Sequence, residues 1–268
     1  MKKIFGLVLT LFFALTLTGC VKEEDKMYEI NKVDDYLYEI NFKDYRYDEK
    51  LETVQGVDDF ACSSVKNGNF YGRNFDFIFN DVVEFVTRVD ASEDRHASIG
   101  VLNNANYTVN DDLITKYKKG LEIIPNNTLD GINDAGVIAS INVVPKSDTL
   151  PITGTNPEGE DLNSMFIVRY VLDHADSADH AIELLSKKNI YGDCGEDFNI
   201  HVMIADKDKT YIVEFIDNKM VAEEKKGNEQ IMTNFYANLE ELSENSAGVE
   251  RYHILQENYD EGNSFEGM

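Results

Sequence analysis

Alternating apolar and polar residues predict a chain built mainly of β-strands. Successive side chains of a strand point to opposite faces, so a half-buried strand shows a period of two and a fully buried strand shows a continuous apolar run. Segments of these two kinds occur at 36–42, 81–90, 96–102, 137–144, 199–206, 210–217 and 229–235. The polar triplet at 207–209 separates two of them and predicts a hairpin.

Helical patterns are fewer and lie mostly in the second half of the chain. Apolar residues spaced three and four apart predict a helix over 162–174, and Ser177 can cap a second helix over 178–188. Shorter helical patterns occur at 111–119 and from Gly248 onwards. The 268 residues are enough for one large core or at most two domains.

The most informative stretch is a second predicted hairpin at 60–77. Asn67-Gly68 is a strong two-residue turn signal, because both residue types tolerate the positive φ angles of a type I′ turn. With the turn at that place, Cys62 lies directly opposite Arg73 on the same side of the hairpin. A guanidinium beside a thiol stabilises the thiolate, which is the nucleophilic form. Taken alone, Cys62 would also fit a small apolar space in an ordinary hairpin.

The same residues resemble a known enzyme family. Cys-Ser-Ser from residue 62, followed by Gly-Arg-Asn-Phe-Asp at 72–76, is similar to the start of the mature choloylglycine hydrolases, which include bile salt hydrolases and penicillin V acylases. The resemblance implies an α+β fold, a four-layer αββα sandwich, with an N-terminal cysteine whose own α-amine is the general base. It makes Cys62 the nucleophile, Arg73 the residue that tunes it, and Asp76 the residue that holds the α-amine.

Two features of the hairpin depart from that family. The loop between Cys62 and Arg73 is shorter than usual. Strict strand alternation also puts Asp76 on the opposite face from Arg73. We therefore expect a twist or a β-bulge to bring Asp76 round to the nucleophile.

Two later stretches carry the same resemblance. Asp-Gly-Ile-Asn-Asp-Ala-Gly at 130–136, with the strand that ends at Asn142, implies that Asn142 supplies an oxyanion-hole donor through its backbone N–H. Thr-Asn at 233–234 implies that Asn234 supplies the side-chain donor, and Arg251 is similar to the family's arginine near the leaving group. Taken singly, Asn234 reads as a turn residue and Arg251 as an exposed helix residue, but their order along the chain favours the family roles.

The N-terminus predicts export and a lipid anchor. A basic start and the apolar run at 4–17 form a secretory signal that is too short to span a membrane. Leu-Thr-Gly-Cys at 17–20 resembles a bacterial lipobox. We therefore expect a signal peptide over 1–19, lipid attachment at Cys20, and an extracytoplasmic bacterial membrane lipoprotein. The alternative is an ordinary secretory signal with a coincidental cysteine.

The rest of the chain divides at the predicted nucleophile. Residues 20–61 would be a lipid-anchored tether and propeptide, separated by cleavage before Cys62 from a hydrolase domain over 62–268. The alternative is that this segment belongs to the fold and is not cleaved. The resemblance stops near Tyr252, and the polar tail beyond it shows no apolar pattern. We therefore expect a sandwich that lacks the usual C-terminal strands.

Composition narrows the possible partners. The formal net charge of −25 and the isoelectric point near 4.4 disfavour nucleic acid and anionic membrane surfaces, which would repel the chain. Three cysteines are too few for a disulfide framework, and a bridge from Cys62 to Cys194 would consume the proposed nucleophile. The five histidines lack zinc-like spacing, so we expect neither a metal nor a cofactor.

The family resemblance implies a cysteine amidase that hydrolyses a small linear amide through an acyl-enzyme on Cys62. Conjugated bile salts, penicillin V and N-acyl amides all fit, and the oligomeric state stays open. A papain-type enzyme is disfavoured, because the chain lacks that family's motif around the cysteine and has no tryptophan. The alternative from a different class is a surface lipoprotein that uses a degenerate hydrolase fold for binding and does not catalyse.

Overall fold

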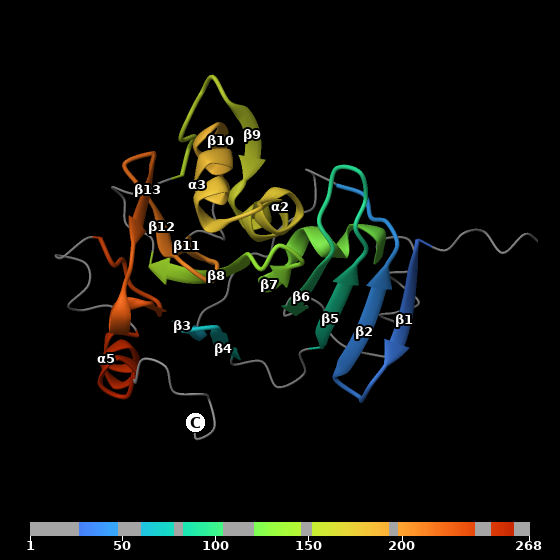
Figure 1. The fold of residues 1–268 in the computed structure, drawn as a ribbon, viewed down its shortest axis with the longest axis horizontal. Coiled ribbons are helices and arrows are strands. Elements are labelled where there is room, and N and C mark those ends of the chain that lie inside the picture. The colour runs from blue at the N-terminus through green and yellow to red at the C-terminus, as the bar shows by residue number, and fades with distance from the viewer. Residues whose placement is uncertain are drawn as a thin grey trace, which may run out of the picture.

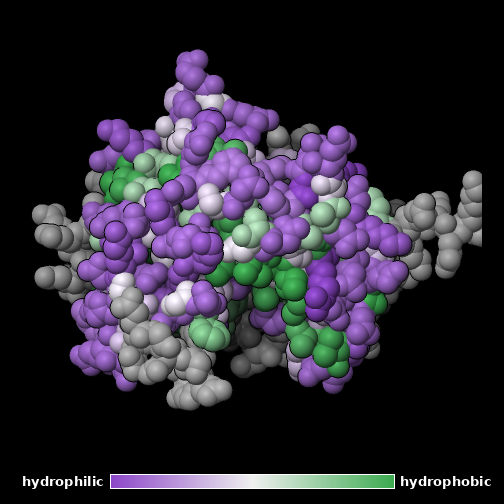
Figure 2. Space-filling view, in the orientation of Figure 1, coloured by the Kyte–Doolittle hydropathy of each residue, from purple (hydrophilic) through white to green (hydrophobic). Residues whose placement is uncertain are grey.

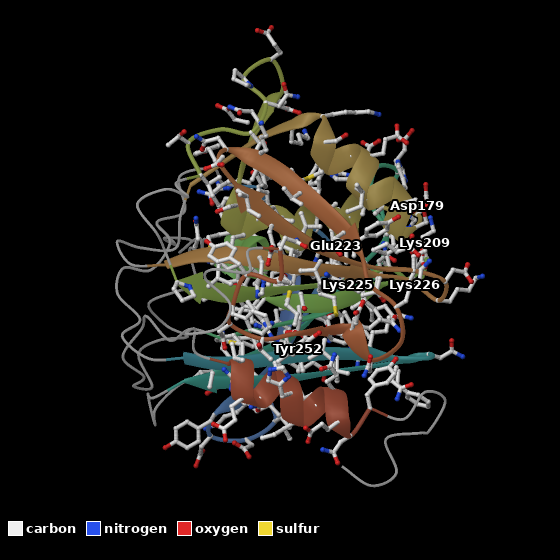
Figure 3. All side chains as sticks on the ribbon, turned by 90° about the vertical axis from the view of Figure 1, so that its left-hand side faces the viewer. Asp179, Lys209, Glu223, Lys225, Lys226 and Tyr252 are labelled. Atoms are coloured by element: carbon white, nitrogen blue, oxygen red, sulfur yellow. The ribbon has the colours of Figure 1, made fainter. Side chains whose placement is uncertain are left out.

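The chain folds into two face-to-face sheets with helices on both outer sides (Figures 1 and 3). This computed structural model describes residues 27–47, 60–77, 83–103, 121–145, 152–192, 198–238 and 248–259. In Figure 3 the layers follow one another from top to bottom as helix, sheet, sheet and helix. The predicted α+β class and its αββα layering are confirmed.

The larger sheet has nine strands among the described residues, in the order β1-β2-β5-β6-β7-β8-β11-β12-β13. Neighbouring strands are antiparallel except for β2 and β5, which are parallel. The strands span Tyr28–Lys32 (β1), Leu37–Phe42 (β2), Glu84–Val89 (β5), Ser98–Asn103 (β6), Asp130–Asn133 (β7), Ile138–Pro145 (β8), Phe198–Ala205 (β11), Thr210–Ile216 (β12) and Lys219–Glu224 (β13).

The smaller sheet is formed by the predicted hairpin and one short strand. Its order is β14-β3-β4, and its strands span Phe60–Asn67 (β3), Phe70–Phe77 (β4) and Ile231–Met232 (β14). One side of this sheet faces β8 of the larger sheet. The helix Val249–Glu257 (α5) covers its other side (Figure 3), where Tyr252 meets the ring of Phe235 edge-on with centroids 5.2 Å apart.

The outer helix layer covers the centre of the larger sheet. It consists of Ile167–His174 (α2), which packs on β7 and β8, and Ala178–Ser186 (α3), which packs on β11, and both bury apolar side chains in the core. The hydroxyl of Ser177 accepts the backbone N–H of His180 at 3.1 Å, so the predicted cap of α3 is confirmed. The apolar periodicity of these helices therefore decides which side faces the sheet.

The predicted propeptide is an integral part of this uncleaved fold. Strands β1 and β2 both come from it, and they form one end of the larger sheet (Figure 1). Tyr38, Ile40 and Phe42 of β2 are buried in a second apolar cluster. Beyond β2, the backbone carbonyl of Arg46 accepts a hydrogen bond at 2.9 Å from Asn126 in the 3₁₀ helix Leu121–Asn127 (η1). Whether this segment is also cut from the rest stays a prediction.

The helix predicted over 162–174 begins only at Ile167. The residues before it form a short strand, Glu160–Asn163 (β9), which pairs in parallel with Lys188–Tyr191 (β10). A 3₁₀ turn at Ser164–Phe166 (η2) connects β9 to the helix. Pairing with a distant strand therefore overrides the helical periodicity at the start of this segment.

The strand predicted over 229–235 is also shorter than expected. Only β14 pairs with β3, and a 3₁₀ turn at Gly227–Glu229 (η3) precedes it.

Strand β13 of the larger sheet was not predicted. It follows β12 through Asp217 and Asn218, whose φ angles of 50° and 57° are those of a type I′ turn. The Asp-Asn pair was the local signal for that hairpin.

Several predictions concern residues outside those described. They are the signal peptide over 1–19, the lipid site Cys20, the helix over 111–119 and any role for Cys194. Within the described part of the chain, no helix is long and apolar enough to cross a membrane. The face shown in Figure 2 is mostly hydrophilic, in keeping with the net charge of −25.

Candidate active site

The turn of the β3–β4 hairpin lies at Gly68-Asn69, one residue later than predicted. Gly68 has a φ of +56° and Asn69 is not left-handed, which follows the type II′ pattern of a glycine at the first central position. Asn67 stays in β3, opposite Phe70. Glycine adopts a positive φ at lower cost than asparagine, which explains why the turn forms in this frame.

This shift changes the register around the predicted nucleophile. Cys62 lies opposite Phe75, and Arg73 lies opposite Ser64. The prediction that Cys62 directly opposes Arg73 is therefore wrong, because its partner lies two residues further along β4. Residues two apart on a strand share a face, so Cys62 and Arg73 are still diagonal neighbours on the same side of the hairpin.

Arg73 reaches from the smaller sheet to the larger one. Its Nη1 atom lies 3.0 Å from Oδ1 of Asp130, and its Nη2 atom donates to the carbonyl of Ile141 at 2.6 Å. The guanidinium lies over the ring of Phe75, 4.5 Å from the centroid. Only 4% of the Arg73 side chain is exposed. The guanidinium is therefore fixed between β4, β7 and β8.

Burial and charge act against each other at this ion pair. Burial raises the pKa of the Asp130 carboxyl, and the attraction of Arg73 opposes this rise only in part. Burial also disfavours the Arg73 cation, but Asp130, Tyr71 and Cys62 outweigh it and raise the pKa of the guanidinium. Arg73 is therefore a permanent positive charge in electrostatic contact with Cys62.

Cys62 is a free cysteine whose backbone is held by two distant side chains. Its side chain is buried. Its N–H donates to Oδ1 of Asn234 at 2.8 Å, and its carbonyl accepts a hydrogen bond from Nη1 of Arg251. The same Nη1 atom donates to the hydroxyl of Ser63 at 2.9 Å. The structure thus brings Cys62, Asn234 and Arg251 together.

Asn234 connects Cys62 to both α5 and the larger sheet. Besides Cys62, its Oδ1 atom accepts a hydrogen bond from Nη2 of Arg251 at 2.7 Å. Its Nδ2 atom donates to the carbonyl of Val143 at 2.7 Å. These partners identify which atom of the Asn234 side chain is the amide oxygen and which is the nitrogen. The nitrogen carries two hydrogens, and the bond to Val143 uses one of them. Asn234 can therefore donate to a substrate oxygen while it holds Cys62.

Gly248 lets α5 approach Asn234 closely. It caps the helix with a φ of +100°, and a Cβ atom there would lie 2.8 Å from the backbone nitrogen of Asn234 and 3.0 Å from Nη2 of Arg251. The hydroxyl of Thr233 donates to its carbonyl at 3.0 Å. Both the backbone angle and the lack of space require glycine at this position.

Asn142 is buried in β8 and uses its side chain to support the same region. Its Nδ2 atom donates to the carbonyls of Met232 and Thr233, each at 3.2 Å. The backbone N–H of Ile141 donates to Leu129 on the β7 side at 2.8 Å, so strand alternation directs the N–H of Asn142 towards β11. The amide of Asn142 thus supports the segment that leads to Asn234.

The backbone does not bring Asp76 to the side of the hairpin that carries Cys62. It opposes Ala61, on the hairpin face away from Cys62 and Arg73. The pairing of the two described strands is continuous over 60–67 and 70–77, so the bulge that we expected is absent from it. The side chain of Asp76 lies outside the described part of the structure.

The sequence interpretation missed three polar residues in this region. Asp130 binds Arg73, and the buried pair His201 and Glu214 lies next to Asn142. Charged residues inside otherwise apolar strands were the available signal for the last two. Among the described residues, no group of three or more His, Cys, Asp or Glu side chains could hold a metal ion.

Comparisons with known proteins found a matching family and similar solved structures. Residues 63–264 match the family described as acyl-coenzyme A:6-aminopenicillanic acid acyl-transferase. A mutant of conjugated bile acid hydrolase from Clostridium perfringens is similar in structure, with 18% identity and a TM-score of 0.44 over 67% of this chain and 54% of that chain. Penicillin V acylase from Agrobacterium tumefaciens has 16% identity and a TM-score of 0.35 over 68% of this chain and 47% of that chain. No curated protein matches the chain. The chain spans about half the length of these solved structures.

Proposed function

The chain belongs to the acyl-coenzyme A:6-aminopenicillanic acid acyl-transferase family, and on that premise we propose that it is a cysteine amidase that hydrolyses a small linear amide. Cys62 is the nucleophile, and its own α-amine, freed by cleavage after Ala61, is the general base. The observation that carries the proposal is the hydrogen bond of 2.8 Å from the Cys62 nitrogen to Asn234, because this nitrogen becomes the amine.

The enzyme first has to mature. In the uncleaved chain, β3 runs through the bond between Ala61 and Cys62, and the thiol is buried. The Cys62 sulfur adds to the Ala61 carbonyl, the C–N bond breaks, and the proton passes to the leaving nitrogen. Water then hydrolyses the thioester, which leaves a carboxylate on Ala61 and a free α-amine on Cys62. Withdrawal of Phe60 and Ala61 from β3, with β1 and β2 still in place, opens the thiol to substrate.

Catalysis repeats this chemistry on an external amide. The α-amine takes the thiol proton, the Cys62 thiolate attacks the substrate carbonyl, and the leaving amine receives that proton. Water then releases the acyl group and restores the thiol. Asn234 donates from Nδ2 to the oxyanion, a kind of contact whose loss typically costs roughly 10²–10³ in rate.

The remaining residues stabilise the nucleophile and its surroundings. Arg73 supplies a fixed positive charge on the face of Cys62, and Arg251 holds the Cys62 carbonyl beside the leaving group. Asn142, expected as the second oxyanion donor through its N–H, supports the Asn234 segment with its side chain in the uncleaved chain. Asp76 retains its proposed role at the α-amine if cleavage lets the start of β3 turn towards it.

The acyl acceptor could also be an amine. The family's description names an acyl-transferase, and transfer to an amine would use the same acyl-enzyme on Cys62. The two reactions differ only in the group that attacks the thioester in the second step. Product analysis with and without an added amine such as 6-aminopenicillanic acid distinguishes them.

The test combines chain processing with substrate turnover. Intact mass and N-terminal sequencing of the purified full chain should reveal a new terminus at Cys62, and released amine should be detected with glycocholate, penicillin V or an N-acyl amide. Cys62→Ala should stay uncut and inactive, whereas Cys194→Ala, the matched control, should behave as the parent. An uncut and inactive parent chain, or parental turnover by Cys62→Ala, would contradict the proposal.

We also propose that Cys20 carries a lipid in the exported protein. The lipobox-like sequence at 17–20 supports this. The parent chain should partition into detergent after expression in bacteria, and Cys20→Ala should partition into the aqueous phase.

A further inference from the structure

A row of buried polar side chains crosses the larger sheet beneath the segment that carries Asn234. Asn142 in β8 lies opposite His201 in β11, and Glu214 in β12 is one residue beyond the Val202–Val213 pair, beside His201. The Nδ1 atom of His201 is 3.3 Å from Oε1 of Glu214. Their side chains are 1% and 0% exposed.

The first half of this row holds the backbone before Asn234. The carbonyl of Thr233 accepts a hydrogen bond from Nε2 of His201 at 2.7 Å. The same carbonyl accepts from Nδ2 of Asn142 at 3.2 Å. Two side chains from adjacent strands therefore bind the residue that directly precedes Asn234.

The second half of the row holds the backbone after Asn234. Oε1 of Glu214 accepts the N–H of Ala237 at 2.7 Å, and Oε2 accepts the N–H of Asn238 at 3.0 Å. Both carboxylate oxygens thus bind successive backbone N–H groups. Asn234 lies between these two attachments, with its Oδ1 atom on the nitrogen of Cys62.

The hydrogen bonds assign the donors and acceptors in this row. A carbonyl oxygen only accepts, so Nε2 of His201 carries a hydrogen. Glu214 accepts from two backbone N–H groups, which is the pattern of an ionised carboxylate.

We propose that His201 and Glu214 are positioning residues for the acyl-transfer reaction, which hold the segment 233–238 so that Asn234 binds the Cys62 amine and the substrate oxyanion together. This inference rests on the proposed function of the site. It assigns a role to the two residues through Asn234 and not through contact with substrate.

Turnover of processed enzyme tests the kinetic consequence. With penicillin V or glycocholate, Glu214→Gln should lower kcat by about 10- to 100-fold at unchanged KM, because a displacement of about 1 Å at a catalytic group can cost that much. His201→Gln keeps a nitrogen near the Nε2 position and His201→Asn does not, so Gln should retain more of the parental kcat. The matched control is Asn133→Ala, which loses hydrogen bonds to the carbonyls of Leu172 and Ala175 near the helix layer. It should lower stability and leave kcat unchanged.

Hydrogen exchange tests the same proposal without any turnover. In the uncleaved Cys62→Ala chain, Glu214→Gln should speed exchange of the Ala237 and Asn238 amides by at least tenfold more than Asn133→Ala does. If the parent hydrolyses no amide, the proposed function fails and this measurement alone decides the role in positioning the segment. Unchanged exchange, or a Glu214→Gln enzyme with parental kcat, would overturn the proposal. If Glu214→Gln does not fold, the two His201 variants decide. A kcat of His201→Gln that is no higher than that of His201→Asn would then overturn the proposal.

Discussion

The backbone nitrogen of Cys62 donates to Oδ1 of Asn234 over 2.8 Å and joins residues 172 positions apart. Cys62 belongs to the smaller sheet, whereas Asn234 follows its short outer strand and is tied to β8 through Val143. One side-chain amide therefore binds the backbone nitrogen of Cys62 and connects the two sheets. Changes that move Asn234 should affect Cys62 even when they lie far from it in sequence.

Gly248→Ala should impair the site more than its effect on stability explains. A left-handed φ costs a non-glycine residue about 1–2 kcal/mol, and the added methyl group would lie 2.8 Å from the Asn234 nitrogen. We expect slower processing and a lower kcat. Gly227→Ala is the control, because Gly227 also has a positive φ of 55° but open space around it. Equal losses of kcat in both variants at matched stability would show that the contact between residue 248 and Asn234 is not the cause.

The ion pair of Arg73 and Asp130 should matter for stability and activity in different ways. Asp130→Ala leaves a buried guanidinium without its partner, which typically costs about 3–5 kcal/mol. The double variant Arg73→Leu with Asp130→Leu should recover much of that stability in urea unfolding. It should still lack turnover, because the positive charge beside Cys62 is gone. A double variant with parental turnover would remove Arg73 from the mechanism.

The propeptide should stay bound after cleavage. Strand β2 pairs along its length with β5 and buries Ile40 in the core, so cutting before Cys62 leaves these contacts intact. The two pieces should separate on a denaturing gel and elute together in native size-exclusion chromatography. Ile40→Asp should prevent this association, whereas Val33→Asp, at a position 55% exposed, should not. Separate elution of the parental pieces would show that the segment is released.

Stability should fall as the pH drops below neutrality, in part through His174. The ring of His174 is partly exposed but loses enough solvent to lower its pKa, and Asp173 together with the Asp94 carbonyl opposes this only in part. A lowered folded pKa means that the unfolded chain binds the proton first, so stability is lost as the pH falls below about 6.5. Urea midpoints at pH 7.5 and 5.5 should differ less in His174→Phe than in the parent. The same substitution at exposed His253 should leave the difference unchanged.

Local patterns in the sequence were enough for the family, the fold class and most elements. The period of two located β2, β5, β6, β8, β11 and β12, and the Ser177 cap located α3. These signals are short-range, because alternation, capping and turn preference each depend on a few neighbouring residues. The predicted family is confirmed by the family match over residues 63–264.

The pairing register of the β3–β4 hairpin could not be predicted from such local patterns. A turn that begins at Gly68 instead of Asn67 moves the partner of every β3 residue two positions along β4, and both frames satisfy local turn preferences. Packing of Arg73 against Asp130 and Ile141 is possible only in a folded hairpin that meets the other sheet.

The sequence by itself determined which residue types were available for chemistry and roughly which elements carry them. The tertiary structure decided which of them meet: it joined Cys62 to Asn234 and Arg251, and it placed His201 beside Glu214. It left Asp76 on the other face of its strand. The reason is physical, because such contacts arise when distant strands share a sheet and their buried polar groups must find partners there, and no local pattern encodes that choice.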